Sequence, residues 1–185
     1  MKKLLDRIKL CMLPPPQRRS LPYECYWEDS ILSQEQERIF SNQWLGLGRS
    51  DRLQNPGEYE AFELCGQALV LIRNQDKELR LYANTCRHRG AKLLDGSGQC
   101  QAISCPFHGW TYSLDGNLKH AKTMAENSSF DFADNSLIEY KLKELQGFLF
   151  GFLGNTPTDL SNQLGNFSEL HQPWSMNELV TTRRA

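Results

Sequence analysis

Residues 85–110 read TCRHRGAKLLDGSGQCQAISCPFHGW and contain two short loops that each combine a cysteine with a histidine. In the first loop one residue separates Cys86 from His88, and in the second loop two residues separate Cys105 from His108. Sixteen residues lie between His88 and Cys105. Four metal-binding side chains at such paired spacings are improbable as a chance arrangement of buried residues. The pattern therefore predicts a metal centre held by Cys86, His88, Cys105 and His108.

Three kinds of linkage suit these residues: a [2Fe–2S] cluster, a zinc ion or a disulfide. Zinc takes the same atoms, but zinc fingers usually keep two cysteines in one half and two histidines in the other. Here each half is mixed, which favours a cluster with both cysteines on one iron and both histidines on the other. A disulfide between Cys86 and Cys105 would leave the histidines without a role. Gly90 and Gly109 let the backbone bend close to the site.

Short segments with an alternation of two surround the loops and predict β-strands. They cover residues 44–48, 59–64, 68–73, 79–83, 102–104, 110–113, 142–145 and 148–153. The sequence Leu114-Asp-Gly-Asn117 predicts a hairpin turn after one of them. Many short strands at this spacing are typical of a mainly β fold, a small antiparallel β-sandwich or barrel.

The flanking segments suggest four divisions of the chain. Residues 1–20 form a flexible basic leader, at most a short amphipathic turn, and residues 21–43 form an N-terminal extension. In this extension residues 21–27 are extended, and a capping box at Ser33–Gln36 predicts a helix to about Trp44 with Ile39 and Phe40 facing inward. Residues 44–155 form the metal-binding domain. Residues 156–185 form a linker and the start of another domain, with a strand beginning at Leu179.

The amino-acid composition limits the kinds of partner that we expect for this chain. The chain has 185 residues, 39% of them hydrophobic, and a net charge of −1, so nothing indicates nucleic acid as a partner. No apolar run is long enough to span a bilayer, and the leader lacks a secretory apolar region, so we expect no membrane association and a cytoplasmic protein. Without an export signal, the remaining cysteines are expected to be reduced thiols: Cys11, Cys25, Cys65 and Cys100.

The two loops, together with Trp110–Gly116 and Gln146–Phe152, resemble the N-terminal part of the α subunit of a Rieske non-haem iron oxygenase (ring-hydroxylating dioxygenase type). The resemblance covers about residues 21–155. It implies a Rieske [2Fe–2S] cluster on Cys86, His88, Cys105 and His108, reduced by an NAD(P)H-dependent flavin reductase or a ferredoxin. It also implies a homo-oligomer, a trimer in the full-length form. Electrons then pass to a mononuclear Fe(II) that activates O₂ for hydroxylation or demethylation.

The loops differ from those of cytochrome bc-type Rieske domains. Those domains carry an extra disulfide between the loops and a serine after the second-loop glycine, whereas this chain has Ala91, Phe107 and Trp110 there. With fewer hydrogen-bond donors to the cluster sulfurs, the reduced cluster is stabilised less. We therefore expect a reduction potential near the low end of the Rieske range, about −150 mV. Arg87, Arg89 and Lys92 are either docking residues for an acidic partner or a solvated loop face.

The second iron site of such oxygenases has no ligands in this sequence. A mononuclear iron needs two histidines and a carboxylate, and only His120, expected at the surface, and His171, expected in a loop, remain. No catalytic residue is therefore assigned, and we expect an α subunit that is truncated before its catalytic domain. The alternative is a stand-alone Rieske ferredoxin, which the extra residues at both ends disfavour. The substrate, an aromatic ring or a quaternary ammonium compound, is not encoded here.

Overall fold

The computed structural model describes residues 2–122, 124 and 129–182, and the chain forms two compact units, Met1–Ser41 and Asn42–Ala185. The first unit contains α1 (Lys2–Lys9), η1 (Leu10–Met12), η2 (Tyr23–Tyr26) and α2 (Asp29–Arg38), and η3 (Phe40–Asn42) follows. Arg7 and Glu24 form an ion pair of 2.6 Å that joins α1 to η2. The leader, for which at most a short turn was predicted, thus contains two turns of α-helix.

Predictions for two segments of the first unit, residues 21–27 and the helix that follows, are wrong. The segment around Tyr23–Tyr26 is not extended but forms the 3₁₀ helix η2. Helix α2 begins at Asp29, four residues before the predicted cap, and Ser33 lies inside the helix, where its hydroxyl donates to the Asp29 carbonyl (2.8 Å). The helix also ends early, and Ile39, predicted to face inward, is 49% exposed.

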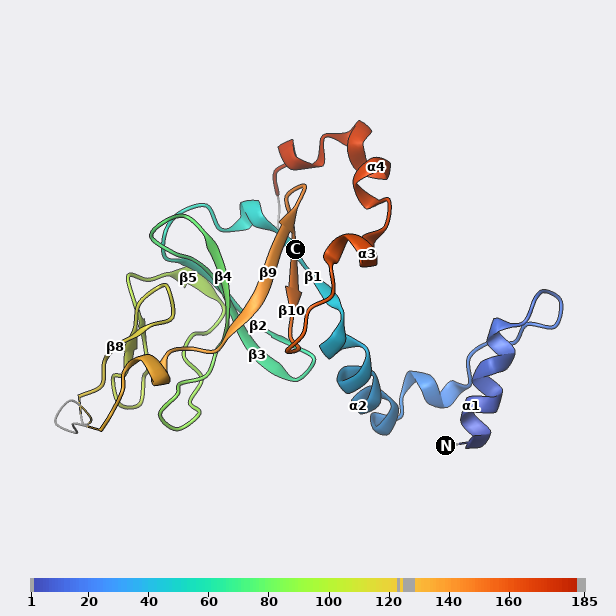
Figure 1. Cartoon of the computed structure of the whole chain (residues 1–185), viewed down its shortest axis with the longest axis horizontal. Coiled ribbons are helices and arrows are strands. Elements are labelled where there is room, and N and C mark those ends of the chain that lie inside the picture. The colour runs from blue at the N-terminus through green and yellow to red at the C-terminus, as the bar shows by residue number, and fades with distance from the viewer. Residues whose placement is uncertain (1, 123, 125–128, 183–185) are drawn as a thin grey trace. The chain divides into compact units, whose positions relative to one another are not determined.

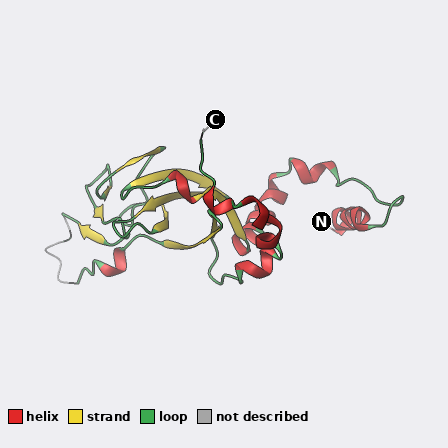
Figure 2. Ribbon diagram, turned by 90° about the horizontal axis from the view of Figure 1, so that it is seen from above, coloured by secondary structure: helices red, strands yellow, loops and turns green. Residues whose placement is uncertain are grey.

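The second unit is built on a seven-stranded antiparallel sheet that curls on itself (Figures 1 and 2). The strands lie in the order β1-β10-β9-β4-β3-β2-β5, and their bounds are β1 (Trp44–Arg49), β2 (Glu58–Leu64), β3 (Gln67–Arg73), β4 (Leu79–Ala83), β5 (Ser97–Gln99), β9 (Glu139–Leu145) and β10 (Phe148–Phe152). A smaller sheet has the order β6-β7-β8, with β6 (Ile103–Ser104), β7 (Thr111–Tyr112) and β8 (Leu118–His120). The 3₁₀ helix η4 (Ser50–Arg52) lies between β1 and β2, and the 3₁₀ helix η5 (Ala133–Asn135) lies between β8 and β9.

Central strand β3 is buried on both of its faces, which explains its uninterrupted apolar run. Leu69 and Leu71 pack into one core cluster with Leu81. Val70 and Ile72 pack into a second cluster, to which the side chains of Cys86 and Cys105 also belong. The predicted mainly β, antiparallel fold is confirmed, and the second core supports the cysteines of the predicted centre.

The segment after β10 contains α3 (Leu160–Leu164), α4 (Phe167–His171), η6 (Gln172–Trp174) and η7 (Met176–Glu178). The side chain of Gln163 covers the start of edge strand β1, because its amide accepts from the Trp44 N–H and donates to the Trp44 carbonyl, each at 2.8 Å. His171, predicted to lie in a loop, stands on α4, where its Nδ1 lies 2.7 Å from the Phe167 carbonyl oxygen.

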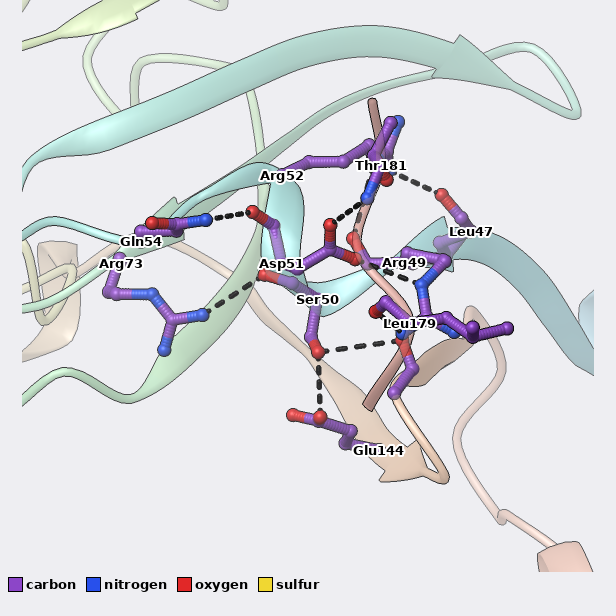
Figure 3. Close-up of polar contacts among 11 residues, drawn as sticks. Leu47, Arg49, Ser50, Asp51, Arg52, Gln54, Arg73, Glu144, Leu179 and Thr181 are labelled. Atoms are coloured by element: carbon purple, nitrogen blue, oxygen red, sulfur yellow. Dashed lines mark hydrogen bonds and ion pairs between the residues drawn. The ribbon is translucent and has the colours of Figure 1, made fainter. Parts of the chain in front are cut away.

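Residues Leu179–Thr181, predicted to begin a strand, are held instead by one side chain from β1 and one from η4 (Figure 3). The Arg49 guanidinium donates to the Leu179 carbonyl (2.5 Å), and the Asp51 carboxylate accepts from the Thr181 N–H (2.5 Å). Arg49 and Asp51 also form an ion pair of 2.9 Å. These two side chains form a backbone clamp, a name used below for Arg49 and Asp51.

Across the described residues, no helix combines the length and apolar character that a bilayer crossing requires.

Candidate metal centre

The two Cys–His loops share one backbone hydrogen-bond pattern. In the first loop the Cys86 N–H donates to the Ala91 carbonyl (2.8 Å), and the Gly90 N–H donates back to the Cys86 carbonyl (3.0 Å). In the second loop the Cys105 N–H donates to the Trp110 carbonyl (2.8 Å), and the Gly109 N–H donates back to the Cys105 carbonyl (3.1 Å). The two loops are therefore equivalent turns, although their cysteine-to-histidine spacings differ.

A glycine occupies the same position in both turns because the backbone there has a positive φ. Gly90 has φ +74° and Gly109 has φ +69°, values that residues with a Cβ atom adopt only at a cost in strain. Both glycines stand four residues after a cysteine. The glycines thus bend each loop back over its cysteine, as the sequence predicted.

The four predicted ligands line one cavity of about 290 Å³. Cys86 and Cys105 are buried at its inner side, whereas His88 is half-buried and His108 is exposed. The two imidazole rings lie 4.9 Å apart between centroids, with their planes near perpendicular at 78°. The fold thus brings all four predicted residues together, with the thiols towards the core and the imidazoles towards the surface.

His88 is held by an aromatic neighbour. Its ring stacks on the indole of Trp110 at a centroid distance of 4.8 Å and an interplanar angle of 11°. Its Nδ1 is buried without a hydrogen-bond partner among the described atoms. Burial, with the nearby charges of Arg89 and His108, lowers the pKa of His88 and favours the neutral imidazole that metals bind.

Tyr112 on β7 is a functional residue that the sequence analysis missed. Its hydroxyl oxygen accepts from the Arg87 N–H (3.0 Å) and lies 3.4 Å from the Cys86 sulfur. A thiolate can only accept, so the hydroxyl donates to Cys86 when that residue is a metal ligand. Burial and the hydrogen bond to Cys86 raise the pKa of Tyr112, which keeps this donor protonated.

The donor set fits a [2Fe–2S] cluster of the Rieske type. Two buried thiols, the half-buried imidazole of His88, whose Nδ1 has no hydrogen-bond partner among the described atoms, and the exposed imidazole of His108 offer two sulfur and two nitrogen ligands. Among the described residues, no three His, Cys, Asp or Glu side chains converge as they would on a single ion. A two-iron cluster takes only two protein ligands on each iron.

Two basic side chains flank the predicted ligands. Arg87 and Arg89 are both exposed, and Arg89 contributes to the wall of the cavity. Lys92 instead pairs with Asp95. Phe107, next to His108 in the second loop, is 74% exposed. The cavity therefore opens on a surface that carries positive charge and one exposed aromatic ring.

His120, one of the two remaining histidines, is exposed on β8, as predicted. His171 is far from it in sequence and is tied to α4 by the contact with Phe167. All six cysteines are free thiols.

A β-domain that presents two cysteines and two histidines in paired loops defines a Rieske-type iron–sulfur protein. The family model described as Rieske [2Fe–2S] domain matches residues 43–141, more than half of the chain. The chain belongs to this family.

Its relatives include the carnitine monooxygenase oxygenase subunit of Escherichia coli (strain K12), 34% identical over 151 residues. That match covers 81% of this chain and 40% of the relative. The glycine betaine monooxygenase oxygenase subunit of Chromohalobacter salexigens is 28% identical over 162 residues, which cover 86% of this chain and 36% of the relative.

The chain also resembles solved structures of Rieske oxygenases. The quaternary ammonium Rieske monooxygenase CntA in complex with L-carnitine superposes with a TM-score of 0.81 at 34% identity, over 89% of this chain and 47% of that chain. The chain spans about 40% of the length of the curated relatives it matches. The resemblance to part of a Rieske oxygenase α subunit is therefore confirmed.

Proposed function

We propose that Cys86, His88, Cys105 and His108 hold the [2Fe–2S] cluster, with both thiolates on one iron and both imidazoles on the other. The observation that supports this assignment is the single cavity that all four line, with thiols inside and imidazoles outside. The cluster supplies one-electron chemistry when bound. The chain's own residues orient His88 through Trp110, donate to the Cys86 sulfur through Tyr112, and expose His108 at the surface.

The proposal extends to the longer protein of which such a domain forms part. Electrons enter from an NAD(P)H-dependent flavin reductase or a ferredoxin and pass to a mononuclear iron for O₂-dependent hydroxylation or demethylation. The names of the relatives support a quaternary ammonium substrate. We further propose a homotrimer in the cytoplasm, and the division into residues 1–20, 21–43, 44–155 and 156–185.

A stand-alone ferredoxin is the weaker alternative. The relatives named above are oxygenase subunits, which supports the oxygenase role over that of a free carrier.

Metal analysis tests the ligand assignment. We expect two irons and two acid-labile sulfides per chain, a red-brown colour, and loss of both in Cys86→Ser and Cys105→Ser. Cys65→Ser is the matched control, because Cys65 lies in the turn between β2 and β3 and should leave iron and sulfide unchanged. Stoichiometric zinc without sulfide in the wild-type protein would contradict the proposal.

A further inference from the structure

The two equivalent ligand loops are closed at their bases in different ways. The second loop joins two paired strands, β6 and β7, with Ile103 opposite Tyr112 and Ser104 opposite Thr111. The hydroxyls of Ser104 and Thr111 also lie 3.1 Å apart. Ordinary strand pairing therefore holds Cys105 and His108 in register.

The first loop has no such pair of strands. Strand β4 ends at Ala83, and the base of the loop then has an isolated bridge between Thr85 and Lys92 and one backbone bond from the Leu93 N–H to the Asn84 carbonyl (3.3 Å). The loop carries Cys86 and His88, and its base lacks the paired strands that close the second loop.

The side chain of Asn84 takes the place of the missing strand pairing. Its amide nitrogen donates to the Leu94 carbonyl (2.7 Å), and its amide oxygen accepts from the Leu94 N–H (2.9 Å). These two bonds imitate a pair of ladder hydrogen bonds across the base of the loop. The backbone of Asn84 is satisfied as well, because its N–H donates to the Ala68 carbonyl (2.8 Å) on β3.

Burial makes this contact rigid. Asn84 is 0% exposed, so water does not compete for its amide. Asn84 stands two residues before Cys86 and links β3 to the far end of the loop. Its side chain therefore ties the far end of the loop to the residue that follows β4.

We propose that Asn84 is a positioning residue of the metal centre: its side chain sets the register of the first ligand loop against the second. The inference rests on the proposed function of Cys86 and His88 as ligands. Loss of the Asn84 amide lets the first loop move while the second stays in place, so the bond angles at the ligands change and the cluster is held less well.

The experiment compares Asn84→Ala with Asn74→Ala in the iron-loaded protein. Asn74 is a matched control, because it is 1% exposed, accepts from the Glu78 N–H (2.8 Å) and donates to Asp115 (2.8 Å), but closes the turn between β3 and β4. Three properties are measured: the EPR g-values of the reduced state, the midpoint potential, and the rate of iron loss to a chelator.

We expect Asn84→Ala to shift the g-values and the potential and to lose iron about tenfold faster than the wild type. Asn74→Ala should lower only the temperature of unfolding. Wild-type g-values, potential and iron loss in Asn84→Ala would overturn the proposal.

If Asn84→Ala does not fold, Asn84→Ser is measured in the same way and decides by the same criteria. Unfolding of both variants while Asn74→Ala folds would make Asn84 a residue of the general fold and would also overturn the inference. A wild-type protein without iron and sulfide would instead contradict the proposed function, so the two failures are distinguishable.

Discussion

The hydroxyl of Tyr112 links the protein scaffold to a single ligand atom. It lies 3.4 Å from the Cys86 sulfur and is held in place by the Arg87 N–H. A hydrogen bond to a sulfur ligand stabilises the reduced, more negative state of an iron–sulfur centre more than the oxidised state. Tyr112 should therefore offset part of the lowering of the potential that was expected from Trp110 in place of a serine.

Tyr112→Phe should lower the midpoint potential by about 40 mV, which corresponds to about 1 kcal/mol for a one-electron couple. Protein-film or redox-dye titration of the iron-loaded variant measures the change. Tyr140→Phe is the control, since the Tyr140 hydroxyl donates to Gln67 (2.8 Å) and does not contact the ligand loops. Equal potentials for Tyr112→Phe and the wild type would remove the hydroxyl from the centre.

At the scale of single residues, the sequence predicted the four ligands but not the residues that hold those ligands in place. The ligands pair within short stretches, Cys86 with His88 and Cys105 with His108, so the pattern can be recognised from the sequence without knowledge of the fold. Tyr112 stands 26 positions from Cys86, and its contact exists only because β7 lies beside the first loop. The role of Asn84 depends in the same way on a partner in the chain beyond the loop, Leu94.

Strands could be predicted from the sequence where the spacing of apolar residues reflects which side chains are buried. The strands from Trp44 to Ala83 and β10 lie within one or two residues of the predicted ranges, because one or both faces of each are apolar. Strand β5, Ser97–Gln99, was missed, since its three residues are exposed and carry no apolar signal. Only pairing with distant Glu58–Glu60 makes this segment a strand.

The start of α2 was misplaced for a different reason. The capping-box pattern at Ser33 is also compatible with a helix interior, where the hydroxyl bonds to the carbonyl four residues earlier. The actual N-cap, Glu28, makes no side-chain capping bond, so the sequence offers no signal there.

The segment after η7 depends on the backbone clamp of Arg49 and Asp51 shown in Figure 3. Burial alone would raise the pKa of Asp51, but the hydrogen bonds from Thr181 and Arg49 outweigh it and hold that pKa below its ordinary value. A carboxylate with a lowered pKa stabilises the folded form above the unfolded pKa of about 3.9. That contribution is lost as the pH falls through the folded pKa.

Asp51→Asn should reduce the hydrogen-exchange protection of the Thr181 amide about fivefold at pH 7, equivalent to about 1 kcal/mol. The difference from the wild type should begin to shrink below the unfolded pKa of about 3.9 and should disappear as the pH falls through the lower folded pKa of Asp51. Asp159→Asn is the matched control, because Asp159 accepts from the Ser161 N–H (3.0 Å) and should affect that amide alone. Unchanged protection of Thr181 in Asp51→Asn would exclude the clamp.

For the whole molecule, the four histidines lie in three different places. Two of the four line the cavity, His120 is exposed on β8, and His171 is engaged with Phe167. The 185-residue chain therefore offers no second group of two histidines and a carboxylate within its described residues.

The iron-loaded chain should be reduced by a flavin reductase with NADH but should show no carnitine-dependent O₂ consumption. Bleaching of the visible absorbance measures reduction, and an oxygen electrode measures uptake. Cys86→Ser controls for direct electron transfer to other groups and should show no bleaching. Carnitine-dependent O₂ uptake by this chain would contradict the proposal that oxygenation needs a second iron site outside these residues.

Strands β1 and β10, which come first and last along the chain among the strands of the large sheet, are direct neighbours, with Trp44 opposite Phe152. The chain thus enters and leaves the β-structure at adjacent points on one edge, while both ligand loops lie between these strands in the sequence. A body with adjacent entry and exit can be inserted into a longer polypeptide, or exchanged with a related one, without rerouting the rest of the chain. Residues 44–152 therefore have the construction of a cassette, a segment whose two ends lie together and which contains both ligand loops complete.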